Sequence, residues 1–159
     1  MQTTVNAKQA FGLVGTFYDD SARRVAPYNL VATAAGVAPT IGRVFTADAN
    51  DVNKAVMAGE GSILGVLVSP HEYTLNGLDA SLALTAGTVG EICSFGHIVV
   101  ASTTAVSVGN VAAYNKTTGE IGAYASASDV PSTHAQIPNA RFILVNAAIG
   151  EPAVLELGN

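Results

Sequence analysis

The stretch that decides the fold is Gly61-Ser-Ile-Leu-Gly-Val-Leu-Val-Ser-Pro-His-Glu-Tyr-Thr-Leu-Asn-Gly77. Its first part, Ile63 to Val68, is an apolar run rich in branched aliphatic residues, which is typical of a strand buried on both faces. A short buried helix is the alternative, but the two glycines around the run disfavour it. Pro70 ends the run because proline has no N–H to donate to a β-ladder, and Asn76-Gly77 predicts a turn. We therefore expect this strand near the middle of a β-sheet.

Turn signals divide the rest of the chain into further short strands, and no sustained amphipathic helix is predicted. Alternating apolar residues predict a half-buried strand over residues 78–85. Gly96, inside the extended stretch 88–101, predicts a bulge or corner, and Gly119 predicts the left-handed residue of a hairpin loop. With about seven to nine strands, the class is all-β, a sandwich or a barrel. We also expect strands over residues 41–46, 111–114, 121–125, 141–146 and 153–157, a long loop over 125–138, and any short helical turn within 47–61.

Residues 1–30 show no clean periodicity, and we interpret them as an extended N-terminal arm before a single β-sandwich domain over residues 31–159. A long irregular segment is usually functional when a compact domain contains one. An arm that only packs on its own domain is the alternative.

Composition narrows the function classes. The chain has 159 residues, of which 49% are hydrophobic and only 12% are charged, with a net charge of −5. A freely soluble surface normally carries more charge, so this one either consists mostly of Ser, Thr, Asn, Gly and Ala or is partly covered by a partner. The acidic balance argues against nucleic-acid binding, and no apolar run is long enough for a membrane span. The lack of a signal peptide and the single cysteine suit a protein made in a reducing cytoplasm.

Residue types that carry out chemistry are scarce. His71, His97 and His134 share no metal-ligand spacing, so we expect one strand histidine and two surface histidines, with no metal and no cofactor. Cys93 is interpreted as a buried thiol. The sequence contains no phosphate-loop signature, and its few aromatic residues supply a poor stacking platform for sugars or bases. The sequence therefore predicts a protein that is not an enzyme.

Four stretches carry a further signal: Phe11-Gly-Leu-Val-Gly-Thr-Phe-Tyr-Asp-Asp-Ser, Ile41-Gly-Arg-Val-Phe-Thr, Ile63-Leu-Gly-Val-Leu-Val-Ser-Pro-His-Glu-Tyr and Gly90-Glu-Ile-Cys-Ser-Phe-Gly-His-Ile-Val-Val. They resemble the cement, or decoration, proteins of tailed-phage capsids. The resemblance implies a jelly-roll-like β-sandwich. It also implies a homo-oligomer on the outer surface of the icosahedral head, which bridges neighbouring major capsid proteins and stabilises the shell against packaged DNA. It rests on strand and turn patterns, and it carries over no functional residue.

The irregular N-terminal region supplies the predicted contact residues for the major capsid protein or for another copy of the chain. These residues place apolar and basic groups in a segment without regular structure. Most basic residues lie in the first third of the chain, which suits an acidic partner surface, although chance could produce the same asymmetry. We expect a homodimer, with a homotrimer as the alternative, made in the host cytoplasm. The predicted contact residues are Phe11, Phe17, Tyr18, Arg23 and Arg24.

Two other functions stay open at this point. A carbohydrate- or receptor-binding jelly-roll domain of a virion surface protein predicts a shallow groove with aromatic side chains. It could hold calcium at Asp48, Asn50 and Asp51. A small barrel enzyme of the cupin type requires the three histidines to converge on a metal.

Overall fold

The structure is a computed structural model that describes residues 12–69 and 83–158. Within these residues it consists of strands and one short 3-10 turn, so the all-β prediction is confirmed. In chain order the elements are β1 (Arg24–Val31), β2 (Val44–Ala47), β3 (Lys54–Met57), β4 (Ile63–Leu67), β5 (Val89–Ala101), β6 (Val111–Asn115), β7 (Ile121–Tyr124), η1 (Ala127–Asp129), β8 (His134–Ile143) and β9 (Pro152–Leu157).

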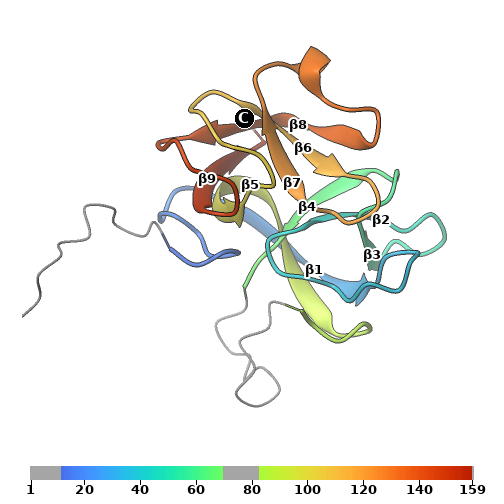
Figure 1. Ribbon diagram of the computed structural model, residues 1–159. Helices are drawn as coiled ribbons and strands as arrows, with labels where there is room; N and C mark the ends of the chain where they lie inside the picture. Colours follow the sequence, from blue (N-terminus) through green and yellow to red (C-terminus); the bar gives the residue numbers. More distant parts are fainter. Residues whose placement is uncertain (1–11, 70–82, 159) are drawn as a thin grey trace, which may run out of the picture.

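The strands form two halves that share β5 (Figure 1). In the first half the order is β1–β3–β2–β4–β5, and β1 also pairs with β5, so this sheet closes on itself as a barrel. In the second half the order is β5–β9–β8–β6–β7. The chain just after β5 curls this sheet further, because the Thr103 amide donates to the Ile121 carbonyl in β7. This barrel-like arrangement is consistent with the predicted β-sandwich of jelly-roll type.

The strand from the opening stretch takes the central place that the sequence predicts. β4 pairs with β2 on one side and with β5 on the other. Leu67 belongs to the core cluster of the barrel and Val66 to the larger cluster of the second half, and both are fully buried. Both faces of β4 are therefore covered by apolar side chains. Gly65 makes this possible, since a Cβ there would clash with the backbone carbonyl of Cys93 in β5.

β5 connects the two halves through a corner at Gly96. Before this glycine the strand pairs with β1 and β4, and from Gly96 to Ala101 it pairs with β9. Gly96 has a φ of +121°, a conformation that side chains rarely adopt. The predicted corner is confirmed.

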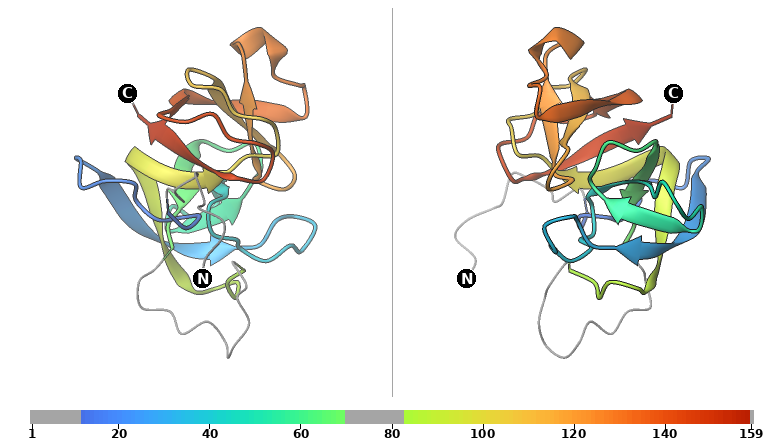
Figure 2. Two further views of the ribbon diagram at one scale, coloured as in Figure 1. Left: turned by 60° about the vertical axis from the view of Figure 1, so that its left-hand side comes forward. Right: turned by 90° about the vertical axis from the view of Figure 1, so that its right-hand side faces the viewer.

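The predicted hairpin with Gly119 is also confirmed. Gly119 has a φ of +73° in the loop between β6 and β7. The turn between β7 and β8, which contains η1, projects from the body of the molecule (Figure 2). Among the described residues, no helix has both the length and the apolar character needed to cross a membrane.

The N-terminal part of the sheet begins earlier than we predicted. Residues 24–30, predicted as part of an arm, form most of β1, which pairs with β3 and β5. The burial pattern of β1 is mostly intermediate or exposed, which explains why its periodicity is weak in the sequence. An arm separate from the domain stays a prediction for residues 1–11, which lie outside the described residues.

Two further local predictions are wrong. β3 occupies the region where a short helical turn was expected, because Ala55 and Met57 alternate into the barrel core. β8 begins at His134, inside the predicted long loop. Its register is irregular opposite β6, and Asn139, next to Pro138, has a φ of +53°. A bulge of this kind allows a strand to contain a proline.

Other predictions fall partly or wholly outside the described residues. Pro70, His71 and the Asn76-Gly77 turn belong to this group. Of the strand predicted over residues 78–85, the described end contains only an isolated bridge between Ala83 and Thr40.

Candidate contact face

The predicted contact residues that the structure describes lie beside β5. The N-terminal segment, defined here as residues 12–23, is held along β5 by backbone hydrogen bonds. The Gly15 amide donates to the Val99 carbonyl at 2.8 Å, and the Tyr18 amide donates to the His97 carbonyl at 3.0 Å. β1 then begins directly after the segment. The sheet therefore places Phe17, Tyr18, Arg23 and Arg24 on one side of the molecule, while Phe11 lies outside the described residues.

These residues differ in what they expose. Phe17 is partly buried against the core cluster of the second half. The Arg23 guanidinium lies 4.4 Å from the centroid of the Phe17 ring, a cation–π contact. Tyr18 and Arg23 are partly exposed, with 44% of the Arg23 side chain accessible. Phe17 therefore anchors the segment, and the groups that remain accessible at the surface are Tyr18 and the two arginines.

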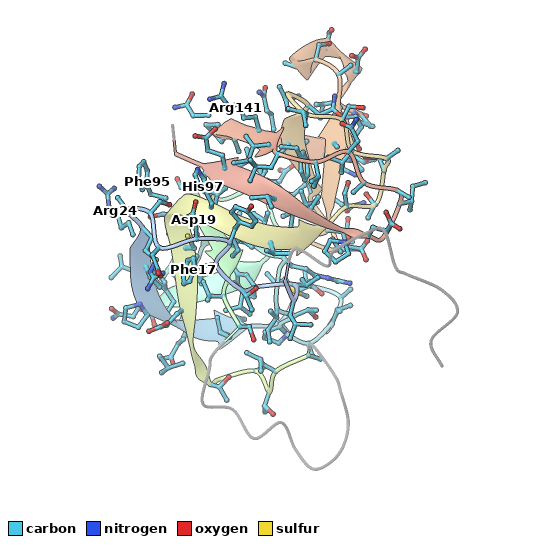
Figure 3. All side chains as sticks on the ribbon, turned by 90° about the vertical axis from the view of Figure 1, so that its left-hand side faces the viewer. Phe17, Asp19, Arg24, Phe95, His97 and Arg141 are labelled. Atoms are coloured by element: carbon cyan, nitrogen blue, oxygen red, sulfur yellow. The ribbon has the colours of Figure 1, made fainter. Side chains whose placement is uncertain are left out.

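Phe95 is an exposed aromatic residue that the sequence analysis did not select. It is 38% exposed, and it lies opposite Arg24 in the pairing of β1 with β5. Figure 3 shows Arg24 and Phe95 side by side, projecting from the same edge of the molecule. A Cβ on Gly158 would lie 2.9 Å from the Phe95 ring, so the C-terminal end of the chain supports this ring from one side.

A row of charged side chains crosses the sheet next to Phe95 (Figure 3). His97 in β5 pairs with Glu156 in β9, which pairs with Arg141 in β8. His97 Nδ1 lies 2.8 Å from Asp19 Oδ2, and its Nε2 lies 3.8 Å from Glu156 Oε1. Arg141 Nε donates to Glu156 Oε2 at 2.7 Å. The histidine thus connects the N-terminal segment to both β5 and β9.

Asp19 is stabilised as a carboxylate. The Ser21 hydroxyl donates to Asp19 Oδ1 at 2.5 Å, and the Ser21 amide donates to the same oxygen at 3.2 Å. These hydrogen bonds lower the pKa of Asp19 from 3.8 to about 2. The largest contribution comes from the Ser21 hydroxyl, followed by the His97 ring and the Ser21 amide. We name this surface the contact face. It consists of the exposed residues Arg23, Arg24, Phe95 and Arg141 and the partly buried His97.

The histidines described by the structure do not converge. His97 lies in a row with Arg141, whereas His134 is seven residues earlier in β8, on the order of 20 Å away along the strand. The His134 ring instead makes an edge contact with Tyr124 at 5.9 Å. In the described part of the chain, no three His, Cys, Asp or Glu residues are grouped closely enough to hold a metal ion. His71 lies outside that part.

The predicted calcium ligands are engaged by their own loop. Asp48 Oδ1 accepts hydrogen bonds from the amides of Asn50 and Asp51 at 2.7 and 3.2 Å. Asp51 in turn forms an ion pair with Lys54 at 3.3 Å. These contacts stabilise the turn between β2 and β3.

A shallow groove lies elsewhere, between the N-terminal segment and the loop before β9. Its lining includes Val14, Ile41, Ile121 and Ile149, and none of its described lining residues is aromatic. It therefore lacks the stacking surface that a carbohydrate site normally contains.

Cys93 is a free buried thiol, as predicted. Its burial raises the pKa of the thiol above the usual 9.0. A raised thiol pKa is the opposite of what a cysteine nucleophile needs.

The described surface thus presents an aromatic ring and guanidinium groups on a β scaffold, and both kinds of group are enriched in protein–protein interfaces. A family model described as "Structural cement protein (E217 gp24/Pam3 gp6)" matches residues 1–158. The chain belongs to this family of phage structural cement proteins, and its role is that of a structural cement protein of the phage capsid.

The fold has a counterpart among solved structures. A chain in the structure described as "The capsid of Myoviridae Phage XM1" superposes with a TM-score of 0.70 at 13% sequence identity, covering 100% of this chain and 98% of that chain. At this identity the likeness concerns the fold. No curated protein matches the chain.

Proposed function

We propose that this protein binds the outer surface of the icosahedral head and bridges neighbouring major capsid proteins. The observation that carries the proposal is the family match, which extends over residues 1–158. Cement by definition joins parts of the shell, so the protein adds contacts and no covalent chemistry. It is made in the host cytoplasm and becomes part of the virion.

Its physical properties support this role. A closed β scaffold holds its surface groups in fixed positions, which lowers the entropy lost on binding. A weak contact that is repeated over many lattice sites adds up to a large stabilisation of the shell. The low charge content, 12% of residues, suits a surface that is partly covered in the particle.

We further propose that the protein acts as a homo-oligomer, a dimer by the general frequency of closed symmetric assemblies, with a trimer as the alternative. The N-terminal region provides the shell contact. Phe11, Tyr18, Arg23 and Arg24 contact the shell, and Phe17 holds the segment in place for them.

The experiment is add-back to shells that lack this protein. Purified protein is mixed with such shells, the shells are pelleted, and bound protein is quantified together with the temperature at which packaged DNA is released. Saturable binding at a fixed number of copies per shell, with a raised release temperature, is expected. Shells that already carry the protein are the matched control and should take up none. Absence of saturable binding to the undecorated shells would overturn the proposal.

A further inference from the structure

We infer that the pair Arg24 and Phe95 receives an acidic segment of the neighbouring shell protein, with a carboxylate on Arg24 and an apolar side chain on the Phe95 ring. This inference rests on the proposed function and adds the chemistry of the partner.

The Phe95 ring is held in place before any partner binds. Gly158 lies against one side of it. The chain at Ala22 and Arg23 crosses the next residue, Gly96, so closely that a Cβ on Gly96 would lie 3.1 Å from the Arg23 Cβ and 3.3 Å from the Ala22 carbonyl oxygen. An aromatic ring that is half-exposed and fixed by its surroundings binds at low entropic cost, which is why such rings often dominate interface energies.

Among the described residues, no acidic group neutralises the Arg24 cation. No carboxylate in the described residues lies within ion-pair distance of it. The acidic groups nearby already have partners. Asp20 lies 3.9 Å from Arg23, Asp19 is bound by Ser21 and His97, and Glu156 accepts a hydrogen bond from Arg141.

A carboxylate is the group best suited to pair with the Arg24 guanidinium. The planar guanidinium presents paired N–H donors that match the two oxygens of a carboxylate. The whole chain carries a net charge of −5. At the contact face, by contrast, the three arginines equal in number the three adjacent carboxylates named above. An acidic segment is therefore repelled less at this face than by the chain as a whole.

The same charges argue against a second copy of this chain as the occupant. In a two-fold symmetric contact, each surface meets its own copy. Such a contact centred on Arg24 would bring the two Arg24 side chains together, with Arg23 close by, and would add no carboxylate at its centre. A shell protein has no such restriction.

The test measures binding of variants to undecorated shells by pelleting, after their melting curves confirm that they are folded. Phe95→Ala should weaken binding about 30-fold or more, the usual effect of removing an aromatic anchor. Arg24→Glu should weaken it about 100-fold, and Arg24→Lys by clearly less, because the charge remains while the paired donors are lost. The matched controls are Val52→Ala, which changes an exposed apolar residue of the β2–β3 turn, and Lys54→Glu, which changes the cation at the start of β3. They should bind within about twofold of the unchanged protein.

The salt dependence of binding gives a second readout, which compares the unchanged protein with Arg24→Glu. Affinity should fall by about tenfold or more between low and high sodium chloride for the unchanged protein, and by much less for Arg24→Glu. Unchanged binding by folded Phe95→Ala and Arg24→Glu would overturn this inference while leaving the proposed function intact. If the unchanged protein itself does not bind shells, both fall. If these variants instead lose self-association in light scattering and still bind shells, the occupant is a second copy and the inference is wrong.

Discussion

Replacing Gly65 with alanine tests why the central strand contains a glycine. Gly65 has a φ of +141°, and its missing side chain faces the backbone of β5. A Cβ there would lie 2.6 Å from the carbonyl carbon of Cys93 and closer still to its oxygen, well inside the contact distance of about 3.5 Å. Neither backbone can give way without disturbing the pairing of β4 with β5.

The expected cost has two parts. A side chain in this region of φ costs about 1–2 kcal/mol, and forced overpacking between two buried strands costs about 1–3 kcal/mol more. We expect Gly65→Ala to lower the free energy of unfolding by about 2–5 kcal/mol, which corresponds to a drop in melting temperature on the order of 10 °C. That is a large share of the stability of an ordinary domain.

Gly109→Ala is the matched control. Gly109 also has a positive φ, +90°, but no atom lies within 4 Å of the position a Cβ would take. This variant should lose only the conformational part, about 1 kcal/mol. Urea unfolding of both variants and of the unchanged protein gives the comparison. Equal losses in the two variants would refute the reasoning that close approach of β4 to β5 requires Gly65.

Three further results are expected from the side chains. The pKa of Asp19, about 2 rather than 3.8, means that its carboxylate stabilises the fold fully above about pH 4 and loses this effect as the pH falls towards 2. After allowance for solvent screening, this acid-dependent loss of stability should be about 1 kcal/mol. In acid unfolding curves, Asp19→Asn should abolish the loss and Asp20→Asn should not. Identical curves for the two variants would contradict this account. The buried Cys93 should react with Ellman's reagent only as fast as the protein opens, so rapid full labelling of the native protein would show that the thiol is accessible. Tyr114→Phe removes the 2.9 Å hydrogen bond from the buried hydroxyl to the Gly59 carbonyl. It should lower the free energy of unfolding by about 1 kcal/mol in urea unfolding. An unchanged midpoint would mean that the bond adds no net stability.

The parts of the fold that could be predicted are those where one local signal suffices. The apolar run of β4 is enclosed on both faces, so its hydrophobicity needs no partner to be recognised. Gly96 and Gly119 mark positions where the backbone needs a positive φ. β3 could not be found in this way, because four residues are too few to give a clear pattern. They become a strand through pairing with β2 and with β1, whose own periodicity is weak.

Phe95 shows why the contact face was only partly predicted. Cys93 and Phe95 are two residues apart, so simple alternation would place both on the same face, and Cys93 is buried. In the structure Val25 is opposite Cys93 and Arg24 is opposite Phe95, which leaves Ser94 as an extra residue in β5. Such a bulge moves the next side chain to the other face and exposes Phe95. The nearby arginines were selected because charged groups in an irregular segment are visible without knowledge of pairing.

The central claim, that the protein joins neighbouring shell proteins from outside, is tested most directly by a cryo-EM reconstruction of the phage head. The account predicts density for this β fold on the outer surface, with each copy or oligomer in contact with two or more major capsid proteins. It further predicts Arg24 and Phe95 at one of those contacts, next to an acidic segment. Density inside the shell, contact with a single capsid protein only, or no density for this protein on the head would contradict the account.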